Sequence, residues 1–261
     1  MPKAAFFDID GTLLSFQTHR ISDGTVRAFQ RLHSAGVRTF LSTGRPEVLI
    51  PDFPLRFDGY ITMNGALVYL DDDRRRTILL SHPIPDSDTQ AWLDIAQRDN
   101  LCTMVFTQQG MLLSQLNDTG LKLRQQLEFK LPPVVDIDKM RHLEIFQIIA
   151  LMPASMDASV AQALPHCRLP RWHPAFTDIV ADGNSKAVGM DAICRHFGIH
   201  QADTIAFGDG ANDIEMLRWA GIGIAMGNAD DTVKAAADMV TADVDHEGIE
   251  QAVEHILNVK P

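Results

Sequence analysis

The sequence predicts an α/β protein: a doubly wound parallel sheet interrupted by an inserted α+β domain. Two observations support this fold class. In the first and last thirds of the chain, short apolar runs alternate with segments of helical periodicity. Such alternation is typical of parallel strands joined by crossover helices. The middle third changes to hairpins mixed with helices, which indicates a separate architecture there.

The first third begins with a buried strand at 3–9, a short apolar run that ends in acids and Gly11. A helix is expected at 22–35, with Ser22 as its N-cap and Gly36 at its C-terminal end. Further strands are expected at 37–42 and 59–63, followed by a hairpin at 66–82.

In the middle third we expect helices at 87–99, 118–128 and 154–164, and strands at 102–107, 111–116, 145–151 and a pair within 168–181. The first pattern resumes at about 183, with helices at 185–197, 212–220, 230–237 and 246–258 and strands at 203–207 and 222–225. We therefore predict one core domain, residues 1–82 and 183–261, split by an insertion at 83–182.

Composition restricts the possible partners. The chain has 23 Lys and Arg against 34 Asp and Glu, a formal charge of −11. Non-specific nucleic-acid binding requires a basic surface, so it is not expected. A small anionic substrate remains possible, because a metal ion and a few cationic side chains can reverse the local field. Nothing in the sequence fixes the oligomeric state.

The cysteines and the apolar runs indicate the compartment. Three widely spaced cysteines suggest neither a disulfide framework nor a zinc motif, and they favour a reducing, cytoplasmic location. The N-terminal residues do not look like a signal peptide. No apolar stretch approaches the roughly 20 residues of a membrane span, so no membrane association is expected.

Acidic residues follow the first strand and the strand at 203–207. Asp8 and Asp10 alternate before Gly11, whereas Asp209 lies between two glycines and is followed by Asn212 and Asp213. Ligands bind at the carboxyl ends of strands in open parallel sheets. The alternative interpretation is structural, because acids and glycines are also common in turns and helix caps.

Two other segments could bind an oxyanion. Thr43, Gly44 and Arg45 follow the second strand and offer a hydroxyl, a small residue and a guanidinium, although for this segment alone a helix cap is the more ordinary interpretation. Lys186 opens a predicted helix, where a cation opposes the helix dipole. A bound anion would explain it, but a solvated surface lysine is the usual finding.

Taken together and in this order, these motifs resemble the haloacid dehalogenase (HAD) superfamily of phosphohydrolases. The matching pattern is DxDGT, then the Thr43–Arg45 segment, a single lysine and GDGxND. The segment 61–66, which contains Asn64, is similar to a signature of the Cof-type branch. That branch carries a large α/β cap between the second and third motifs, so the resemblance implies a Rossmann-like core with a cap domain at 83–182.

The resemblance implies a mechanism. Asp8 would be the nucleophile and form an aspartyl phosphate, and Asp10 would be the general acid–base. Thr43 and Lys186 would stabilise the charge of the transferred phosphoryl group. Mg²⁺ would be the cofactor, and its ligands would be the Asp8 carboxylate, the Asp10 backbone carbonyl, Asp209 and, directly or through a second layer, Asp213.

The resemblance also suggests residues that contact the substrate, a small phosphorylated metabolite. In the core these are Gly44 through its backbone N–H, Arg45, Asn64 and Asn212, which would hydrogen-bond Asp8 or the phosphate. In the insertion, the candidates lie near the last strand pair, where Trp172 could stack on a ring and Asp178 could bind sugar hydroxyls. Arg171, His173 and Thr177 lie beside them.

Several functions remain open at this stage. A sugar phosphate is the leading substrate, because aromatic residues make up only 7% of the chain and a ring cofactor favours flat aromatic surfaces. Pyridoxal phosphate or flavin mononucleotide is the alternative. A sugar phosphotransferase or phosphomutase would transfer the phosphoryl group to another sugar instead of to water. A non-catalytic binding module would be expected to lack Asp8 or Asp10, and both are present.

Overall fold

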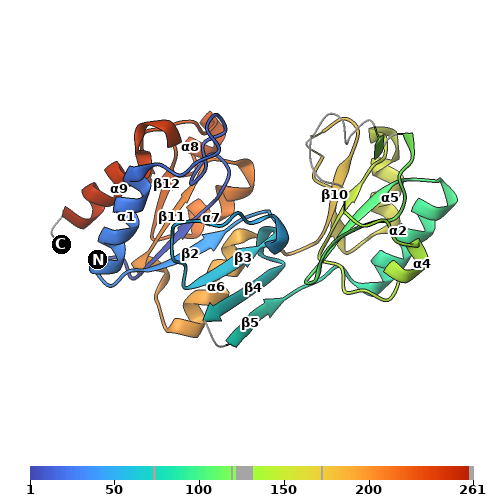
Figure 1. The fold of residues 1–261 in the computed structure, drawn as a ribbon, viewed down its shortest axis with the longest axis horizontal. Coiled ribbons are helices and arrows are strands. Elements are labelled where there is room, and N and C mark those ends of the chain that lie inside the picture. The colour runs from blue at the N-terminus through green and yellow to red at the C-terminus, as the bar shows by residue number, and fades with distance from the viewer. Residues whose placement is uncertain (73–74, 119, 122–131, 172, 259–261) are drawn as a thin grey trace. The chain divides into compact units, whose positions relative to one another are not determined.

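The computed structural model describes residues 1–261 apart from 73–74, 119, 122–131, 172 and 259–261. The chain divides into two compact units. The first comprises Met1–Arg45, Ile50–Ser81 and Ser185–Pro261, and the second comprises Pro46–Leu49 and His82–Asn184. Apart from the short stretch Pro46–Leu49, the chain leaves the first unit after β5 and returns just before α6 (Figure 1).

The first unit contains an eight-stranded sheet in the order β13-β12-β11-β1-β2-β3-β4-β5. Its strands are β1 (Ala4–Phe7), β2 (Arg38–Ser42), β3 (Gly59–Thr62), β4 (Leu67–Asp72), β5 (Arg75–Ser81), β11 (Thr204–Gly208), β12 (Ile222–Ala225) and β13 (Met239–Val240). Neighbouring strands are parallel except in the β3-β4-β5 meander, which is antiparallel.

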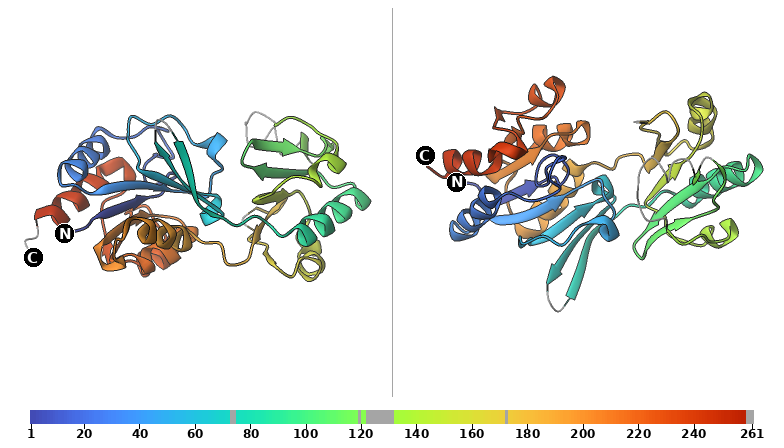
Figure 2. Two further views of the ribbon diagram at one scale, coloured as in Figure 1. Left: turned by 90° about the horizontal axis from the view of Figure 1, so that it is seen from below. Right: turned by 45° about the horizontal axis from the view of Figure 1, so that its top comes forward.

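Helices cover both faces of this sheet (Figure 2). They are α1 (Asp23–Ser34), α6 (Lys186–Phe197), α7 (Ile214–Trp219), α8 (Asp231–Lys234) and α9 (Gly248–Asn258). One apolar cluster packs α1 and α9 against the sheet, and a second packs α6, α7 and α8 against its other face. Because both faces are covered, β1 is an uninterrupted apolar strand, and all four of its residues are fully buried.

The second unit is an antiparallel sheet in the order β7-β6-β8-β10-β9 with helices packed on it. Its elements are α2 (Asp86–Arg98), β6 (Thr103–Thr107), β7 (Gly110–Leu113), α4 (Ile137–Met140), β8 (Gln147–Ala150), α5 (Asp157–Ala163), β9 (Cys167–Arg168) and β10 (Thr177–Ala181). One apolar cluster, which includes Trp92 of α2 and Val160 of α5, joins the helices to the sheet. The predicted fold class, a doubly wound core with an α+β insertion, is confirmed.

Most differences from the predicted elements are short. The strand β13 was not predicted, because two residues carry no detectable periodicity. Between β2 and β3, where three prolines interrupt the chain, only one 3-10 turn forms, at Glu47–Leu49. The helix predicted at 118–128 lies mostly outside the described residues.

The sheet topology places a switch point at β1. The chain builds outward through β2 and β3 on one side of β1 and later through β11 and β12 on the other. Crevices at such reversals, outside the carboxyl ends of the strands, are the usual ligand sites of doubly wound sheets. Asp8 follows β1 at this point, and its backbone N–H donates to the carbonyl of Phe207 in β11, 3.1 Å away.

Candidate active site

Lys186 is the centre of a buried ionic cluster. It is the first residue of α6, and the N-cap Ser185 holds that helix start by accepting from the Val188 N–H. The Lys186 ammonium is fully buried and donates to Oδ1 of Asp8 at 2.6 Å and to Oδ1 of Asp213 at 2.5 Å. The lysine therefore lies against two carboxylates from distant parts of the sequence.

Burial and mutual charge shift the ionisation of this cluster. Burial, reinforced by the negative charge of Asp213, raises the pKa of Asp8 to about 7, although the Lys186 ammonium acts in the opposite direction. Burial lowers the pKa of Lys186, but the Asp213 and Asp8 carboxylates raise it more, so the lysine stays charged. Burial likewise raises the pKa of Asp209 to about 6. The cluster therefore has more negative charge than Lys186 alone can compensate.

The turn after β11 is organised around Asp213. Its Oδ2 accepts from the backbone N–H groups of Asp209 at 3.0 Å and Gly210 at 2.9 Å. A Cβ at Gly208 would lie 2.5 Å from the Cβ of Asp213, so a side chain there would collide with Asp213. The glycines around Asp209 thus allow the Asp213 carboxylate to fold back beneath the turn while its other oxygen binds Lys186.

Asp8, Asp209 and Asp213 form the one group of acidic, histidine or cysteine side chains in the described chain that could hold a metal ion. One carboxylate oxygen from each lies within 4.8 Å of the others. Three ionised carboxylates and one ammonium sum to a charge of about −2, which a divalent cation balances. Carboxylate oxygens are the ligands that hard cations prefer. The residues therefore fit a divalent metal.

Asp10 is paired with Arg45. The guanidinium donates from Nε and from its NH2 group to the two oxygens of Asp10, at 2.8 and 2.6 Å. The Arg45 side chain is 31% exposed and the Asp10 side chain 41%. The two residues predicted as acid–base and substrate contact are thus brought together, and in this structure they bind each other in a bidentate pair.

Thr43, Gly44, Asn64 and Asn212 also meet at this edge of the sheet. The buried Thr43 hydroxyl accepts from the Arg45 N–H at 3.0 Å, which leaves its own proton available to a ligand. A Cβ at Gly44 would lie 3.2 Å from the amide of Asn64. Asn212 donates to the Asn64 side chain at 3.0 Å. The bond from Asn212 to Asp8 or the phosphate that the resemblance implies stays a prediction.

A strained turn presents Asn64. Met63, Asn64 and Gly65 all have positive φ, at 49°, 54° and 91°. For Met63 and Asn64 this conformation is unfavourable. Gly65 cannot carry a side chain, because a Cβ there would lie 2.1 Å from the carbonyl oxygen of Ser185. The turn after β3 therefore packs directly on the residue that caps the helix of Lys186.

The remaining predicted candidates belong to the insertion. Trp172 lies outside the described residues, and Asp178 lies on β10 of the second unit, paired with Ile149 of β8. Arg171 is occupied by internal bonds: its Nε and NH2 group donate to Asp157 at 2.8 and 2.6 Å, and it also donates to backbone carbonyls. These bonds link the segment before β10 to α5 and to the segment after β8.

Sequence reasoning missed Thr12 and Asn228, whose side chains both donate to the Asp209 carboxylate. Thr12 is fully buried, next to the acids that follow β1. Asn228 follows β12, the next parallel strand beyond β11. The rule that polar residues after parallel strands gather at one edge of the sheet could have identified Asn228.

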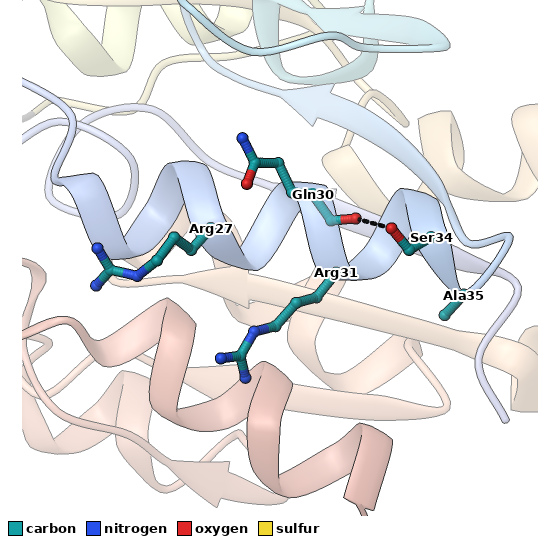
Figure 3. Close-up of a pocket in the computed structure, with 5 residues that line it drawn as sticks. All are labelled: Arg27, Gln30, Arg31, Ser34 and Ala35. Carbon is teal, nitrogen blue, oxygen red and sulfur yellow. Dashed lines mark hydrogen bonds between the residues drawn. The ribbon is translucent and has the colours of Figure 1, made fainter.

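An open pocket of about 500 Å³ lies elsewhere, along α1 (Figure 3). Its lining residues are Arg27, Gln30, Arg31, Ser34 and Ala35. Both of its arginines already have carboxylate partners on α9, Glu250 for Arg27 and Glu254 for Arg31. None of the five lining residues belongs to the cluster around Asp8, so this pocket does not bear on the chemistry.

Comparison with known proteins now identifies the family. The sequence model of the haloacid dehalogenase-like hydrolases matches residues 5–253, nearly the whole chain. The chain belongs to the haloacid dehalogenase-like hydrolase family. It is a phosphatase of that family, a phosphoric monoester hydrolase. No helix in the described part of the chain is long and apolar enough to cross a bilayer.

Three relatives illustrate the similarity. The sugar phosphatase BT4131, of HAD subclass IIB, has a TM-score of 0.83 and 38% identity, covering 97% of this chain and 98% of its own. The pyridoxal phosphate phosphatase YbhA of Escherichia coli is 29% identical over 94% of this chain and 95% of its own. The 5-amino-6-(5-phospho-D-ribitylamino)uracil phosphatase YitU of Bacillus subtilis is 28% identical over 95% of each chain.

Proposed function

We propose that this protein is a Mg²⁺-dependent phosphatase that hydrolyses a small sugar phosphate through an aspartyl-phosphate intermediate on Asp8. The observation that carries the proposal is the buried carboxylate of Asp8, held by the Lys186 ammonium within a cluster of acids that fits a divalent cation. The Lys186 ammonium supplies positive charge beside Asp8. Without such charge the Asp8 carboxylate and a phosphate dianion would repel each other.

In the first step, an Asp8 oxygen attacks phosphorus in line while the bond from phosphorus to the sugar oxygen breaks. Asp10 donates its proton to the departing oxygen. Lys186 and the Thr43 hydroxyl stabilise the charge on the phosphoryl oxygens. The products of this step are the free sugar, the acyl phosphate on Asp8 and an ionised Asp10.

In the second step, water attacks the acyl phosphate, Asp10 takes a proton from that water, and inorganic phosphate leaves Asp8. In this structure both oxygens of Asp10 accept from the Arg45 guanidinium. For the first step Asp10 must hold a proton, so Arg45 has to turn to another anion. The phosphate of the substrate is such an anion, which fits the predicted role of Arg45 as a substrate contact.

Asp8, the backbone carbonyl of Asp10 and Asp209 would hold the Mg²⁺, and the bound ion would neutralise charge shared by the nucleophile and the phosphate. Asp213 already accepts three hydrogen bonds, from Lys186 and from two backbone N–H groups. Its proposed role is therefore to hold Lys186 and the turn that presents Asp209, rather than to bind the ion directly.

The similarity to the sugar phosphatase BT4131 supports a sugar phosphate as substrate. Pyridoxal phosphate is the second candidate, favoured by the similarity to YbhA over nearly the full chain. We propose that residues 83–182 act as the cap domain, with Asp178 and Trp172 setting the preference among leaving groups, while the core residues serve any phosphomonoester. The three free cysteines fit a reducing, cytoplasmic compartment.

The proposal is tested with a panel of about a hundred phosphorylated metabolites, measuring release of inorganic phosphate. Wild-type protein should act on sugar phosphates with Mg²⁺, lose activity in EDTA and respond poorly to Ca²⁺, whose coordination sphere is larger and looser. A second phosphorylated sugar instead of inorganic phosphate would reveal a phosphotransferase.

The intermediate is tested by acid quenching with phosphate-labelled substrate. Wild-type protein should carry an alkali-labile label on the peptide that contains Asp8, and Asp8→Asn should carry none and should not turn over. Substantial turnover by clean Asp8→Asn protein would contradict the assignment of the nucleophile.

A further inference from the structure

Asn228 lies in the loop between β12 and α8 and joins three separate segments. Its side-chain nitrogen donates to Oδ2 of Asp209 at 3.1 Å and to the backbone carbonyl of Gly11 at 2.9 Å. Its side-chain oxygen accepts from the Val244 N–H at 3.0 Å. These partners fix the orientation of the amide, because the nitrogen faces two oxygens and the oxygen faces a donor.

The other oxygen of Asp209 also has a donor. The Thr12 hydroxyl donates to Oδ1 of Asp209 at 2.8 Å. Each carboxylate oxygen is therefore held by a hydrogen bond from a different segment, Thr12 after β1 and Asn228 after β12. A carboxylate oxygen has two lone-pair sites, so one hydrogen bond on each leaves room for a cation. The two hydrogen bonds fix the plane of the Asp209 carboxylate and leave a lone-pair site on each of its oxygens.

Space around Asp209 is limited as well. A Cβ on Gly11 would lie 2.0 Å from Oδ2 of Asp209. Gly11 has φ of 79°, a conformation that glycine adopts easily, and its carbonyl is the second acceptor of the Asn228 amide. Asn228 thus holds the turn after β1 and the carboxylate after β11 at a fixed separation.

We propose that Asn228 is a positioning residue for the metal site, and that together with Thr12 it fixes the Asp209 carboxylate in the orientation that binds the divalent cation. This inference rests on the proposed Mg²⁺ dependence. An asparagine suits the position because its amide both donates to an anion and accepts from a backbone N–H. Aspartate would place a second anion against Asp209, and alanine would leave the carboxylate with the Thr12 hydrogen bond but without the one from residue 228.

The test is Mg²⁺ binding by isothermal titration calorimetry on the full-length, substrate-free protein. Asn228→Ala should raise the Kd for Mg²⁺ by about 10- to 100-fold, as is typical when a partner of a metal ligand is removed. At saturating Mg²⁺, kcat should return to within a few-fold of wild type, because Asn228 acts only through Asp209. Asn117→Ala is the matched control, since Asn117 also donates to a carbonyl and accepts from a backbone N–H. Its Kd should be unchanged.

Thr12 provides an independent arm. Thr12→Val should weaken Mg²⁺ binding, and Thr12→Ser, which keeps the hydroxyl, should retain it. The double variant Asn228→Ala/Thr12→Val should lose less than the product of the single effects, because both donors act on one carboxylate. If Asn228→Ala does not fold, the comparison of Thr12→Val with Thr12→Ser carries the test.

The outcomes separate the two proposals. Absence of Mg²⁺ binding by wild-type protein would overturn the proposed metal dependence. If wild-type protein binds Mg²⁺ and the Kd of Asn228→Ala stays within two-fold of wild type, the positioning role is overturned. A lower free energy of unfolding of that variant would then identify Asn228 as a structural link. Equal Mg²⁺ affinities for Thr12→Val and Thr12→Ser would overturn it as well.

Discussion

Replacing Lys186 with methionine tests the electrostatic centre of the site. Methionine has a similar length and no charge, so packing within α6 should be largely kept. The substitution removes the cation that bonds to both Asp8 and Asp213. Lys186 is fully buried, and its two partners are almost or completely buried. Water therefore cannot replace the lost charge.

The expected cost follows from this burial. Removing one partner of a buried ion pair typically destabilises a protein by about 3–5 kcal/mol, so we expect that loss in EDTA at pH 7. The deficit should depend on pH. The folded-state pKa of Asp8 is already raised to about 7, and loss of Lys186 raises it further. Above pH 7 the folded variant keeps a proton that wild type has lost, so the deficit should grow by up to about 1.4 kcal/mol per pH unit.

The assay is urea unfolding in EDTA at pH 7 and pH 8, with Lys3→Met as the control. Lys3 also pairs with an aspartate, Asp203, at 2.7 Å, but its side chain is 59% exposed, so its loss should cost less than about 1 kcal/mol. Adding Asp213→Asn to Lys186→Met should restore part of the stability. Turnover by Lys186→Met should fall at least 10²–10³-fold. If Lys186→Met had the same free energy of unfolding as wild type at pH 8, the electrostatic argument would be wrong.

Three further predictions concern the same site. Asp10→Asn should slow sugar-phosphate hydrolysis more than acyl-phosphate formation from para-nitrophenyl phosphate, because nitrophenolate leaves without a proton. Single-turnover kinetics should show a burst of nitrophenolate. Equal slowing of both substrates with no burst would contradict the acid–base role. Mg²⁺ should raise the free energy of unfolding more at pH 8 than at pH 5: the folded-state pKa values of Asp8 and Asp209, about 7 and about 6, lie above their unfolded values, so at pH 5 both keep protons that a metal must displace. Urea titrations with Mg²⁺ and with EDTA check this, and equal stabilisation at both pH values would count against it. Gly65→Ala should lower the free energy of unfolding by more than about 1–3 kcal/mol, because its Cβ would lie 2.1 Å from the backbone oxygen of Ser185. Gly36→Ala is the control: Gly36 also has positive φ, but a Cβ there would have nothing within 4 Å, so only backbone strain should destabilise that variant. Similar unfolding midpoints for the two variants would contradict the steric argument.

Sequence patterns were sufficient for the elements that are long and periodic. Ser22 and Gly36 bracket α1 as expected, because capping depends on residues within one turn of each other. The uninterrupted apolar run of β1 indicated a strand covered on both faces. The two-residue strand β13 could not be predicted, since its pairing is set by its neighbour β12 rather than by its own sequence.

The sequence by itself determined the fold class, the family and the motif residues that follow β1, β2 and β11, because these depend on local periodicity and on motif order along the chain. Only the tertiary structure decided how those residues pair. It placed Lys186 between Asp8 and Asp213, turned Arg45 toward Asp10 and Asn212 toward Asn64, and brought Asn228 to Asp209. Several partners of similar hydrogen-bonding strength compete at one sheet edge. The choice among them depends on distances set by packing between segments up to 217 residues apart, as for Asn228 and Gly11.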